Sequence, residues 1–389
     1  ETLFRQEAAG GVTYRIPALL FVPPGTFLAF AEKRSSSRDE DAKFLVLRRG
    51  RWDGRAVEWG PTEELEELTL PGHRTMNPCP VYDASSGTIF LFCICVEHRV
   101  TEWHQILAGR SAARLCCSTS PDRGRSWSHL RDVTEEAIGT DLSHWATFAV
   151  GPGHGVQLDS GRLVVPAYAY YVHGRLCGVP LPCCTRPHSF IFYSDDGGRS
   201  WHKGSLLRGM RTGECQVAEI GSKDQGTLLY CSARRPCRCR AVAISADRGL
   251  RFGLPARCPA LREPPQGCQG SVVSFVPTNT GCPTNAGCPT NTGCPTTTQS
   301  PTNTQSPNGD TQRWLLYSHP TDRRRRRDLG LYLNTAPPNG EGWRHPWVLQ
   351  EGPCGYSDLA ACPGGVFGCL FERGEVSACE EIAFCLFTL

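Results

Sequence analysis

The sequence predicts an all-β fold, and among all-β architectures it favours a β-propeller. Short strand-like segments recur along the 389 residues with turn-forming residues between them, as in sandwiches, barrels and propellers. The composition agrees, because 41 Gly and 30 Pro against 2 Met favour short strands and turns over long helices. A turn motif that occurs three times then favours the propeller, which repeats one unit per blade.

The predicted strands are short apolar or alternating segments bounded by turn residues. Two further segments, 105–107 and 134–138, predict short helices. The predicted strands span residues 27–31, 44–47, 88–96, 162–169, 189–193, 227–231, 314–318, 328–333 and 383–388.

The turn motif has the pattern Ser-x-Asp-x-Gly-x-Ser-Trp. It occupies residues 120–127 and 194–201, and a weaker copy over 245–252 ends in Phe. The Asp can accept hydrogen bonds from turn N–H groups, the Gly supplies a positive φ, and the aromatic ring can pin the turn to the sheet below. We therefore expect structural hairpin turns, one per blade with some blades lacking one, that carry no chemistry.

Residues 277–310 differ from the rest of the chain. Five six-residue units, PTNTGC, PTNAGC, PTNTGC, PTTTQS and PTNTQS, follow one another with almost no large apolar side chain. Such a segment buries too little surface to offset its ordering entropy, and a β-helix of this period would need an apolar residue in each turn. We expect one domain over residues 1–389, with 277–310 as a disordered loop whose folded shoulders are Phe275 and Trp314.

Composition argues against several functional classes. No apolar run approaches the about 18 residues of a transmembrane helix, and a formal charge of +3 argues against a dedicated nucleic-acid binder. None of the 22 Cys stands in C-x-x-C spacing, which counts against zinc ribbons and thioredoxin-type sites. We interpret the cysteines as reduced, small apolar residues of a cytosolic or cytosol-facing protein. A secreted disulfide-bonded protein is the alternative.

Arginines in apolar surroundings are the first sign of a site. Arg15 lies in the apolar stretch 14–17, Arg234 follows the predicted strand 227–231, and the run 323–327 precedes the next predicted strand. Burying an arginine is costly unless it is paired. These residues are therefore either structural ion pairs or receptors for an anion.

Longer motifs resemble those of a known family. Phe-Arg-Gln-Glu at 4–7 and Tyr-Arg-Ile-Pro at 14–17, together with the repeated Ser-x-Asp-x-Gly-x-Ser-Trp boxes, are similar to the exo-sialidase family. The resemblance covers nearly the whole chain except the six-residue repeat, and it implies a six-bladed β-propeller with Asp-box hairpin turns and an active site on its axis. The resemblance is narrowed to the animal cytosolic-type sialidases by segments 30–34, 74–80, 149–154, 267–271 and 356–359. Among these, the sialidases that cleave gangliosides at the plasma membrane are most similar in segments 3–7, 31–35, 144–148 and 354–356.

The resemblance assigns the arginines. Arg15, Arg234 and Arg326 match the three that bind the carboxylate of sialic acid, and a planar guanidinium suits a carboxylate better than a lysine does. If Arg326 lies in a strand, alternation turns it toward the axis and turns Arg325 and Arg327 away.

The resemblance also implies a tyrosine nucleophile, Tyr356. Sialic acid carries a carboxylate on its anomeric carbon, so a carboxylate nucleophile would approach against like charge, and sialidases are an exception to two-carboxylate glycoside hydrolysis. Glu214 matches the base that takes the phenol proton. Asp39 matches the acid/base residue that protonates the departing oxygen and then activates water, giving net retention.

Further pocket positions follow from the same resemblance, which implies no cofactor and no metal. Arg34 and Asn77 would serve polar substituents of the sugar. Tyr168 and Tyr170 would face its glycerol side and the aglycone entrance, although they alternate with Ala in a strand and could simply pack. The complete set is Glu32, Arg34, Met76, Asn77, Glu102, Tyr168, Tyr170 and Gln269.

We therefore expect an exo-α-sialidase that releases terminal α-linked sialic acid from glycoconjugates, gangliosides foremost. The same chemistry on soluble glycoproteins and oligosaccharides is the alternative. A non-catalytic sialic-acid-binding propeller is disfavoured because Tyr356, Glu214 and Asp39 are all present.

The expected location is the periphery of the plasma membrane, with the cytoplasm or another intracellular membrane as alternatives. In the run 323–327, the arginines other than Arg326 would meet anionic lipid head groups. Nucleic acid is a less suitable partner for a chain so close to neutral overall.

Overall fold

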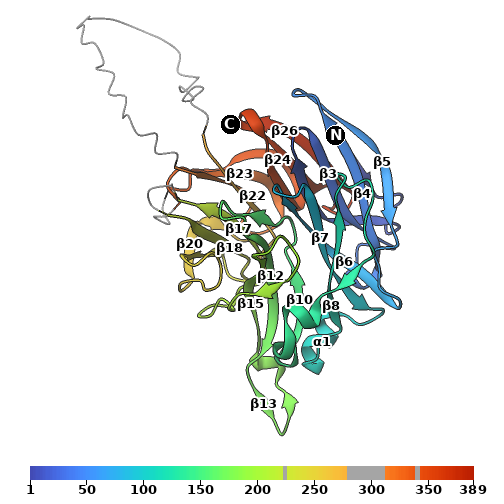
Figure 1. Ribbon diagram of the computed structural model, residues 1–389, viewed down its shortest axis with the longest axis vertical. Helices are drawn as coiled ribbons and strands as arrows, with labels where there is room; N and C mark the ends of the chain where they lie inside the picture. The colour runs from blue at the N-terminus through green and yellow to red at the C-terminus, as the bar shows by residue number, and fades with distance from the viewer. Residues whose placement is uncertain (222–225, 278–311, 338–341) are drawn as a thin grey trace, which may run out of the picture.

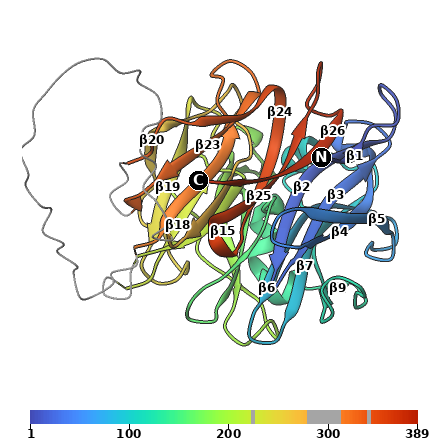
Figure 2. The same cartoon turned by 90° about the horizontal axis from the view of Figure 1, so that it is seen from above.

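The computed structural model describes residues 1–221, 226–277, 312–337 and 342–389 (Figure 1). Within these ranges the strands form six antiparallel blades that close into a ring. Figures 1 and 2 both show the last blade, in red, beside the first blade, in blue. The prediction of an all-β propeller is therefore confirmed.

Blades 1 and 2 are four-stranded antiparallel sheets. In each, the first strand lies innermost in the ring and the last lies at the rim. Blade 1 consists of β2 (Thr13–Val22), β3 (Thr26–Arg34), β4 (Ala42–Trp52) and β5 (Val57–Leu65), and blade 2 of β6 (His73–Asp83), β7 (Thr88–Glu97), β8 (Ala113–Ser120) and β9 (Arg131–Asp132).

Blades 3 and 4 repeat this order, with one short extra strand, β11 (Val156–Gln157), paired to β12. Blade 3 consists of β10 (Trp145–Val150), β12 (Leu163–Val172), β15 (Thr185–Ser194) and β16 (His202–Lys203), and blade 4 of β17 (Cys215–Ile220), β18 (Leu228–Ala233), β19 (Cys239–Ser245) and β20 (Ala256–Arg262).

Blades 5 and 6 share one long strand, β24 (Trp347–Ala361). Its first half pairs with β23 (Arg327–Asn334) as the outer strand of blade 5, and its second half pairs with β25 (Val366–Arg373) as the inner strand of blade 6. Blade 5 also contains β21 (Ser271–Phe275) and β22 (Trp314–Pro320), and blade 6 contains β26 (Glu381–Thr388) and β1 (Thr2–Arg5).

The N-terminal strand closes the ring. β1 pairs antiparallel with β26, with Phe4 opposite Ile382, and Figure 2 shows the two strands together. The N-terminal ammonium of Glu1 donates to the carbonyl of Phe384 at 2.9 Å. The two ends of the chain are thus joined without a covalent bond.

The core lies between the blades. Six clusters of buried apolar residues each join one pair of neighbouring blades. In β7, for example, Ile89 and Leu91 face blade 1, whereas Phe90 and Phe92 face blade 3. Strands buried on both faces in this way read as continuous apolar runs in the sequence.

One face of the ring, here called the front face, carries the connections between the second and third strands of every blade. They span residues 35–41, 98–112, 173–184, 234–238, 321–326 and 374–380. No helix in the described ranges is long and apolar enough to cross a membrane. The front-face connections hold α1 (Glu102–Ala108), the 3₁₀ turns η1 (Asp39–Asp41) and η3 (Pro182–Cys184), and a hairpin of β13 (Arg175–Leu176) and β14 (Val179–Pro180); elsewhere lie α2 (Thr134–Ala137), η2 (Gly139–His144) and η5 (Pro363–Gly365).

The three Ser-x-Asp boxes form turns, as predicted, and these turns lie on the face opposite the front face. In the first box the Asp122 carboxylate accepts the Ser126 hydroxyl at 2.6 Å and the backbone N–H groups of Arg125 and Ser126 at 3.0 and 2.9 Å. These hydrogen bonds, the Ser126 hydroxyl first, lower the pKa of Asp122 to about 2. The Gly124 φ is 78°, which favours glycine.

The tryptophans of the first two boxes contact the preceding blade. Trp201 of blade 3 lies fully buried with its ring centroid 4.5 Å from that of Phe92 in blade 2. Trp127 of blade 2 lies 6.0 Å from Phe30 of blade 1. The boxes therefore fasten neighbouring blades together, which the sequence pattern did not indicate.

Every predicted strand overlaps an observed one, and both predicted helices overlap α1 and α2. The inner strands of all six blades, β2, β6, β10, β17, β21 and β24, were not predicted. The rim strands β1, β5, β9, β16 and β20 and the strands β8, β11, β13, β14, β19 and β25 were missed as well. Prolines and irregular pairing interrupt several of the inner strands, as in β6, which contains Pro78 and Pro80 and whose register against β7 shifts within residues 76–79.

The six-residue repeat lies outside the described residues, apart from Pro277. The strands on either side of it, β21 and β22, pair directly with each other. Phe275 lies opposite Trp314 in this pair, and their rings are 6.1 Å apart.

We predict that Trp201→Ala lowers the free energy of unfolding by about 3–5 kcal/mol, as expected for removal of a fully buried aromatic side chain. Trp127→Ala is the matched control and should cost less, because Trp127 is only half-buried. Denaturant unfolding of both variants measures the difference. Equal losses would mean that burial between blades is not what makes the box tryptophan important.

Candidate active site

A cavity of about 850 Å³ opens at the centre of the front face, and all six blades contribute to its walls. Twelve of the fourteen residues predicted for the site line it. These are Arg15, Arg34, Asp39, Met76, Asn77, Glu102, Tyr168, Tyr170, Glu214, Arg234, Arg326 and Tyr356.

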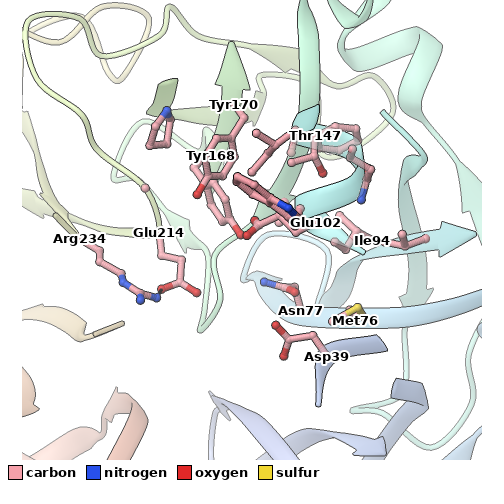
Figure 3. A pocket seen from close by; sticks show the side chains of 18 of the residues that line it. Asp39, Met76, Asn77, Ile94, Glu102, Thr147, Tyr168, Tyr170, Glu214 and Arg234 are labelled. Carbon is pink, nitrogen blue, oxygen red and sulfur yellow. Dashed lines mark hydrogen bonds and ion pairs between the residues drawn. The ribbon is translucent and has the colours of Figure 1, made fainter. Parts of the chain in front are cut away.

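The cavity has two chemically different sides. Figure 3 shows Glu214 and Arg234 on one side and Asp39 on the other, beside Met76 and Asn77. Tyr168, Tyr170 and Glu102 lie above these two groups in the same view.

Irregular inner strands bring several of these side chains to the axis. The register of β2, β6 and β24 against the neighbouring strand shifts within residues 15–18, 76–79 and 354–357. Ile16 and Asn77 have positive φ angles of 62° and 57°. Such irregularities re-aim side chains locally, and here they interrupt the alternation of each strand next to the cavity.

Tyr356, Glu214 and Arg234 form a hydrogen-bonded triangle. The Tyr356 hydroxyl donates to Glu214 Oε1 at 2.6 Å. Arg234 Nη1 donates to Glu214 Oε2 at 2.6 Å and to the Tyr356 oxygen at 2.9 Å. Burial, together with Glu214, raises the pKa of Tyr356 well above its usual value, although Arg234 and Arg326 oppose that rise. The phenol is therefore neutral, with its proton directed at a carboxylate.

Two further arginines lie against the Tyr356 ring. The guanidinium carbons of Arg15 and Arg326 are 5.6 and 5.5 Å from the ring centroid. Arg15 is held from behind by Glu372, whose Oε1 accepts Arg15 Nε at 2.7 Å. Arg326 Nη2 donates to the carbonyl of Gly267 at 3.0 Å. Three guanidinium groups thus converge on one phenol.

Arg326 lies in the turn just before β23, so it is not a strand residue. The prediction that strand alternation turns it toward the axis was therefore wrong in its reason. The turn distinguishes Arg326 from the arginines before it. Arg323, Arg324 and Arg325 are exposed, whereas Arg326 is half-buried and lines the cavity.

Asp39 projects into the cavity from η1. Its carboxylate accepts Arg34 Nη1 at 2.6 Å and is otherwise open to solvent, with 72% of the side chain exposed. Arg34 is buried and also donates from Nε to Glu32 at 2.8 Å. A buried ion pair therefore supports the exposed carboxylate.

Two predicted pocket residues, Glu32 and Gln269, lie behind the cavity wall and do not line it. Glu32 is fully buried, and its charge is compensated by Arg34 and by the backbone N–H of Asn77, which it accepts at 2.7 Å. Gln269 is buried because its amide bridges the carbonyls of Pro152 and Ser357 at 3.1 and 3.0 Å. Both hold the wall in place.

Glu102 enters the cavity from α1, near Tyr168, Glu214 and Asp39. Burial and the neighbouring carboxylates of Glu214 and Asp39 raise its pKa to about 7. The residue as a whole remains solvent-accessible through the cavity mouth. Its carboxyl therefore changes charge near neutral pH.

Sequence reasoning missed several residues of the site. Ile16, Ile94 and Val96 form apolar wall, and Trp103 lies at the mouth. Glu372, which holds Arg15, could have been suspected because it is an acidic residue at the end of an apolar strand. The apolar residues carry no comparable signal.

The comparisons with known proteins identify the family. Residues 25–369 match the BNR repeat-like domain family. The chain is 57% identical to Sialidase-3 of Homo sapiens over 391 residues, which cover 99% of this chain and 91% of that protein. The chain belongs to the animal sialidase family. It is an exo-α-sialidase, a glycoside hydrolase.

Other sialidases are similar over the same length. Sialidase-4 of Mus musculus is 46% identical, over 100% of this chain and 92% of that protein. Among solved structures, the Hadza microbial sialidase Hz136 has a TM-score of 0.74 at 23% identity, over 97% of this chain and 66% of that chain. The intramolecular trans-sialidase from Ruminococcus gnavus has a TM-score of 0.72 at 15% identity, over 100% of this chain and 97% of that chain. The fold is the sialidase β-propeller.

A buried ionic network supports two of the three arginines of this sialidase. The carbonyls of Gln266 and Gly267 accept hydrogen bonds from Arg234 and Arg326. Glu263 anchors that loop, because its Oε2 accepts the backbone N–H of Cys268 at 2.9 Å.

Glu263 is in turn held by two buried side chains, Arg240 at 3.0 Å and His319 at 3.1 Å. Burial opposes its ionisation, yet Arg240 and His319 lower its pKa to about 2. Its stabilising effect is therefore complete above its ordinary pKa of 4.5 and is lost only as the pH falls through about 2.

We predict that Glu263→Gln lowers the free energy of unfolding by about 3–5 kcal/mol at neutral pH, because it leaves Arg240 buried without a carboxylate. KM for any sialoside should also rise, since the loop that holds Arg234 and Arg326 loosens. Glu64→Gln breaks the partly exposed pair with Lys33 and is the control, with an expected loss under about 1 kcal/mol. Indistinguishable unfolding curves and KM values for the two variants would contradict the assigned support.

Proposed function

We propose that this sialidase cleaves terminal sialic acid from gangliosides by a retaining mechanism in which Tyr356 is the nucleophile. The observation that carries the proposal is the 2.6 Å hydrogen bond from the Tyr356 hydroxyl to Glu214 at the point where three arginines converge. This pairing of a neutral nucleophile with a carboxylate base suits a substrate that is itself an anion.

Arg15, Arg234 and Arg326 bind the substrate carboxylate in this proposal. Their guanidinium groups are fixed from behind by Glu372, Gln266 and Gly267, so they are oriented before the substrate arrives. Preorganised arginines hold the substrate carboxylate in place without reorganisation during the reaction, while that carboxylate offsets the positive charge that develops on the oxocarbenium ion.

Bond formation then moves one proton. As the Tyr356 oxygen bonds to the anomeric carbon, its proton passes to Glu214, and Arg234 stabilises both oxygens. Asp39, on the opposite side of the cavity, protonates the departing aglycone oxygen. Asp39 next deprotonates the incoming water, the tyrosyl–sugar bond breaks, Glu214 returns the proton to Tyr356, and the anomeric configuration is retained.

The sugar substituents meet the remaining walls. Asn77 and Arg34 offer donors to polar groups, and Tyr168 and Tyr170 offer hydroxyls and ring surface. Gangliosides are the proposed substrates because the segments 3–7, 31–35, 144–148 and 354–356 resemble the ganglioside-cleaving members, and the periphery of the plasma membrane is the proposed location.

Tyr356→Phe should abolish turnover while leaving the fold intact, because the ring stays and only the reacting oxygen is removed. Tyr230→Phe is the matched control, since the Tyr230 hydroxyl is buried between blades without a hydrogen-bond partner among the described residues. Release of free sialic acid is measured from ganglioside micelles and from a soluble sialyl-oligosaccharide. Residual activity of the Tyr356 variant above about a hundredth of wild type would exclude it as nucleophile, and preference for the soluble sugar would exclude gangliosides as main substrates.

Activity toward anionic substrates should fall as the pH rises through about 7, because Glu102 then becomes charged inside a cavity that must accept a carboxylate. In Glu102→Gln this descending limb of kcat/KM should move to higher pH. Glu97→Gln, at the exposed end of β7, is the control and should keep the wild-type profile. Superimposable profiles for all three proteins would rule out Glu102 as the group responsible.

A further inference from the structure

Helix α1 presents apolar side chains to solvent. Trp103 and Leu107, one helical turn apart, are 64% and 45% exposed, whereas Gln105 and Ile106 are buried. Gln105 is used internally, since its side-chain oxygen accepts the backbone N–H of Ala112 at 2.8 Å. A surface helix ordinarily buries its apolar stripe, so this exposed pair requires an explanation.

The neighbouring hairpin has the same property. Leu176 of β13 and Val179 of β14 lie directly opposite each other and are 66% and 64% exposed. Figure 1 shows this hairpin projecting beyond the body of the propeller at the end where α1 lies. Arg175 Nη2 ties its base to the carbonyl of Ser143 at 3.1 Å.

The two elements are in contact. Gly109, with a φ of 57°, caps the end of α1, and any side chain there would collide with Pro180 of β14. The exposed residues Trp103, Leu107, Leu176 and Val179, here called the apolar rim, therefore belong to one surface. That surface borders the cavity, because Trp103, Pro182 and Cys183 also line it.

Positive charge surrounds the apolar rim. The rim residues lie on the two front-face connections 98–112 and 173–184. These connections contain three arginines and one carboxylate, Glu102, which lines the cavity. The exposed arginines of these connections, of the start of β15 and of the loop after β16 make no ion pair with a carboxylate in the described part of the chain. They are Arg99, Arg110, Arg175, Arg186 and Arg208.

We propose that the apolar rim inserts into the interfacial layer of an anionic lipid bilayer and holds the cavity mouth at the level of the head groups. An apolar tip encircled by unpaired cations complements such a surface, and tryptophan favours that depth. A protein partner would need to supply several carboxylates around an apolar socket, which is a more demanding match. The proposal rests on the ganglioside function proposed above, because it explains how a lipid-bound sugar reaches Tyr356.

Vesicle binding tests the proposal. The triple variant Leu107→Ser, Leu176→Ser and Val179→Ser removes three rim side chains that do not line the cavity. Leu254→Ser is the control, because Leu254 is 86% exposed but lies on the opposite face, between β19 and β20. Cosedimentation uses vesicles of phosphatidylcholine with about one third phosphatidylserine, a composition that attracts basic surfaces.

The wild type and Leu254→Ser should bind these vesicles, and the triple variant should bind at least about tenfold more weakly. Its kcat/KM on a soluble sialyl-oligosaccharide should stay within about twofold of wild type, while hydrolysis of ganglioside in the vesicles falls. Loss of activity on the soluble substrate in Tyr356→Phe tests the catalytic assignment separately.

Equal vesicle binding by wild type and triple variant would overturn the proposal, as would absence of binding by the wild type. If the wild type were a dimer and the triple variant a monomer, with equal vesicle binding by both, the rim would instead be a contact between copies of the chain.

Discussion

Three guanidinium groups share the space around one phenol ring, and keeping that much like charge together is the constraint on which the site depends. Each arginine has a fixed partner behind it: Glu372 for Arg15, Glu214 and the Gln266 carbonyl for Arg234, and the Gly267 carbonyl for Arg326. Two buried carboxylates provide this support. Glu372 binds Arg15 directly, and Glu263 anchors the loop whose carbonyls hold Arg234 and Arg326. The same field explains the tyrosine. A neutral phenol can stand among the arginines without cancelling their positive charge, which is the charge proposed to bind the substrate carboxylate.

The propeller suits this task because its inner strands converge on one axis while its outer strands carry the packing. The apolar clusters between blades do not involve most cavity residues, so stability and chemistry are largely separated along each strand. The inner strands can then tolerate bulges, prolines and positive φ angles near residues 15–18 and 76–79. Irregular backbone is thus concentrated where side chains must be aimed, at a distance from the interlocked aromatic residues that join the blades.

These differences explain what could be read from the sequence. Many second and third strands of the blades and the Ser-x-Asp turns were predictable because their patterns are local: alternation or apolar runs, as in β7, and side-chain hydrogen bonds within five residues at Asp122. The inner strands were not, since Ile16 and Pro78 interrupt the expected pattern for the sake of the site. Family motifs placed twelve residues at the cavity, yet they could not distinguish Arg34, which reaches it, from Glu32 and Gln269, which stand behind it. That distinction depends on long-range packing, as does the contact of Trp201 with the preceding blade.

The shared strand β24 has a mechanical consequence. Its first half belongs to one blade and its second half to the next, and Tyr356 lies just beyond the point where it crosses. Blade 6, which carries Tyr356, is also the blade completed by the four residues of β1 from the other end of the chain. Tyr356, the proposed nucleophile, therefore lies in the blade that is completed by pairing between the two ends of the chain. Closure of the ring and placement of the Tyr356 hydroxyl against Glu214 thus depend on the same blade.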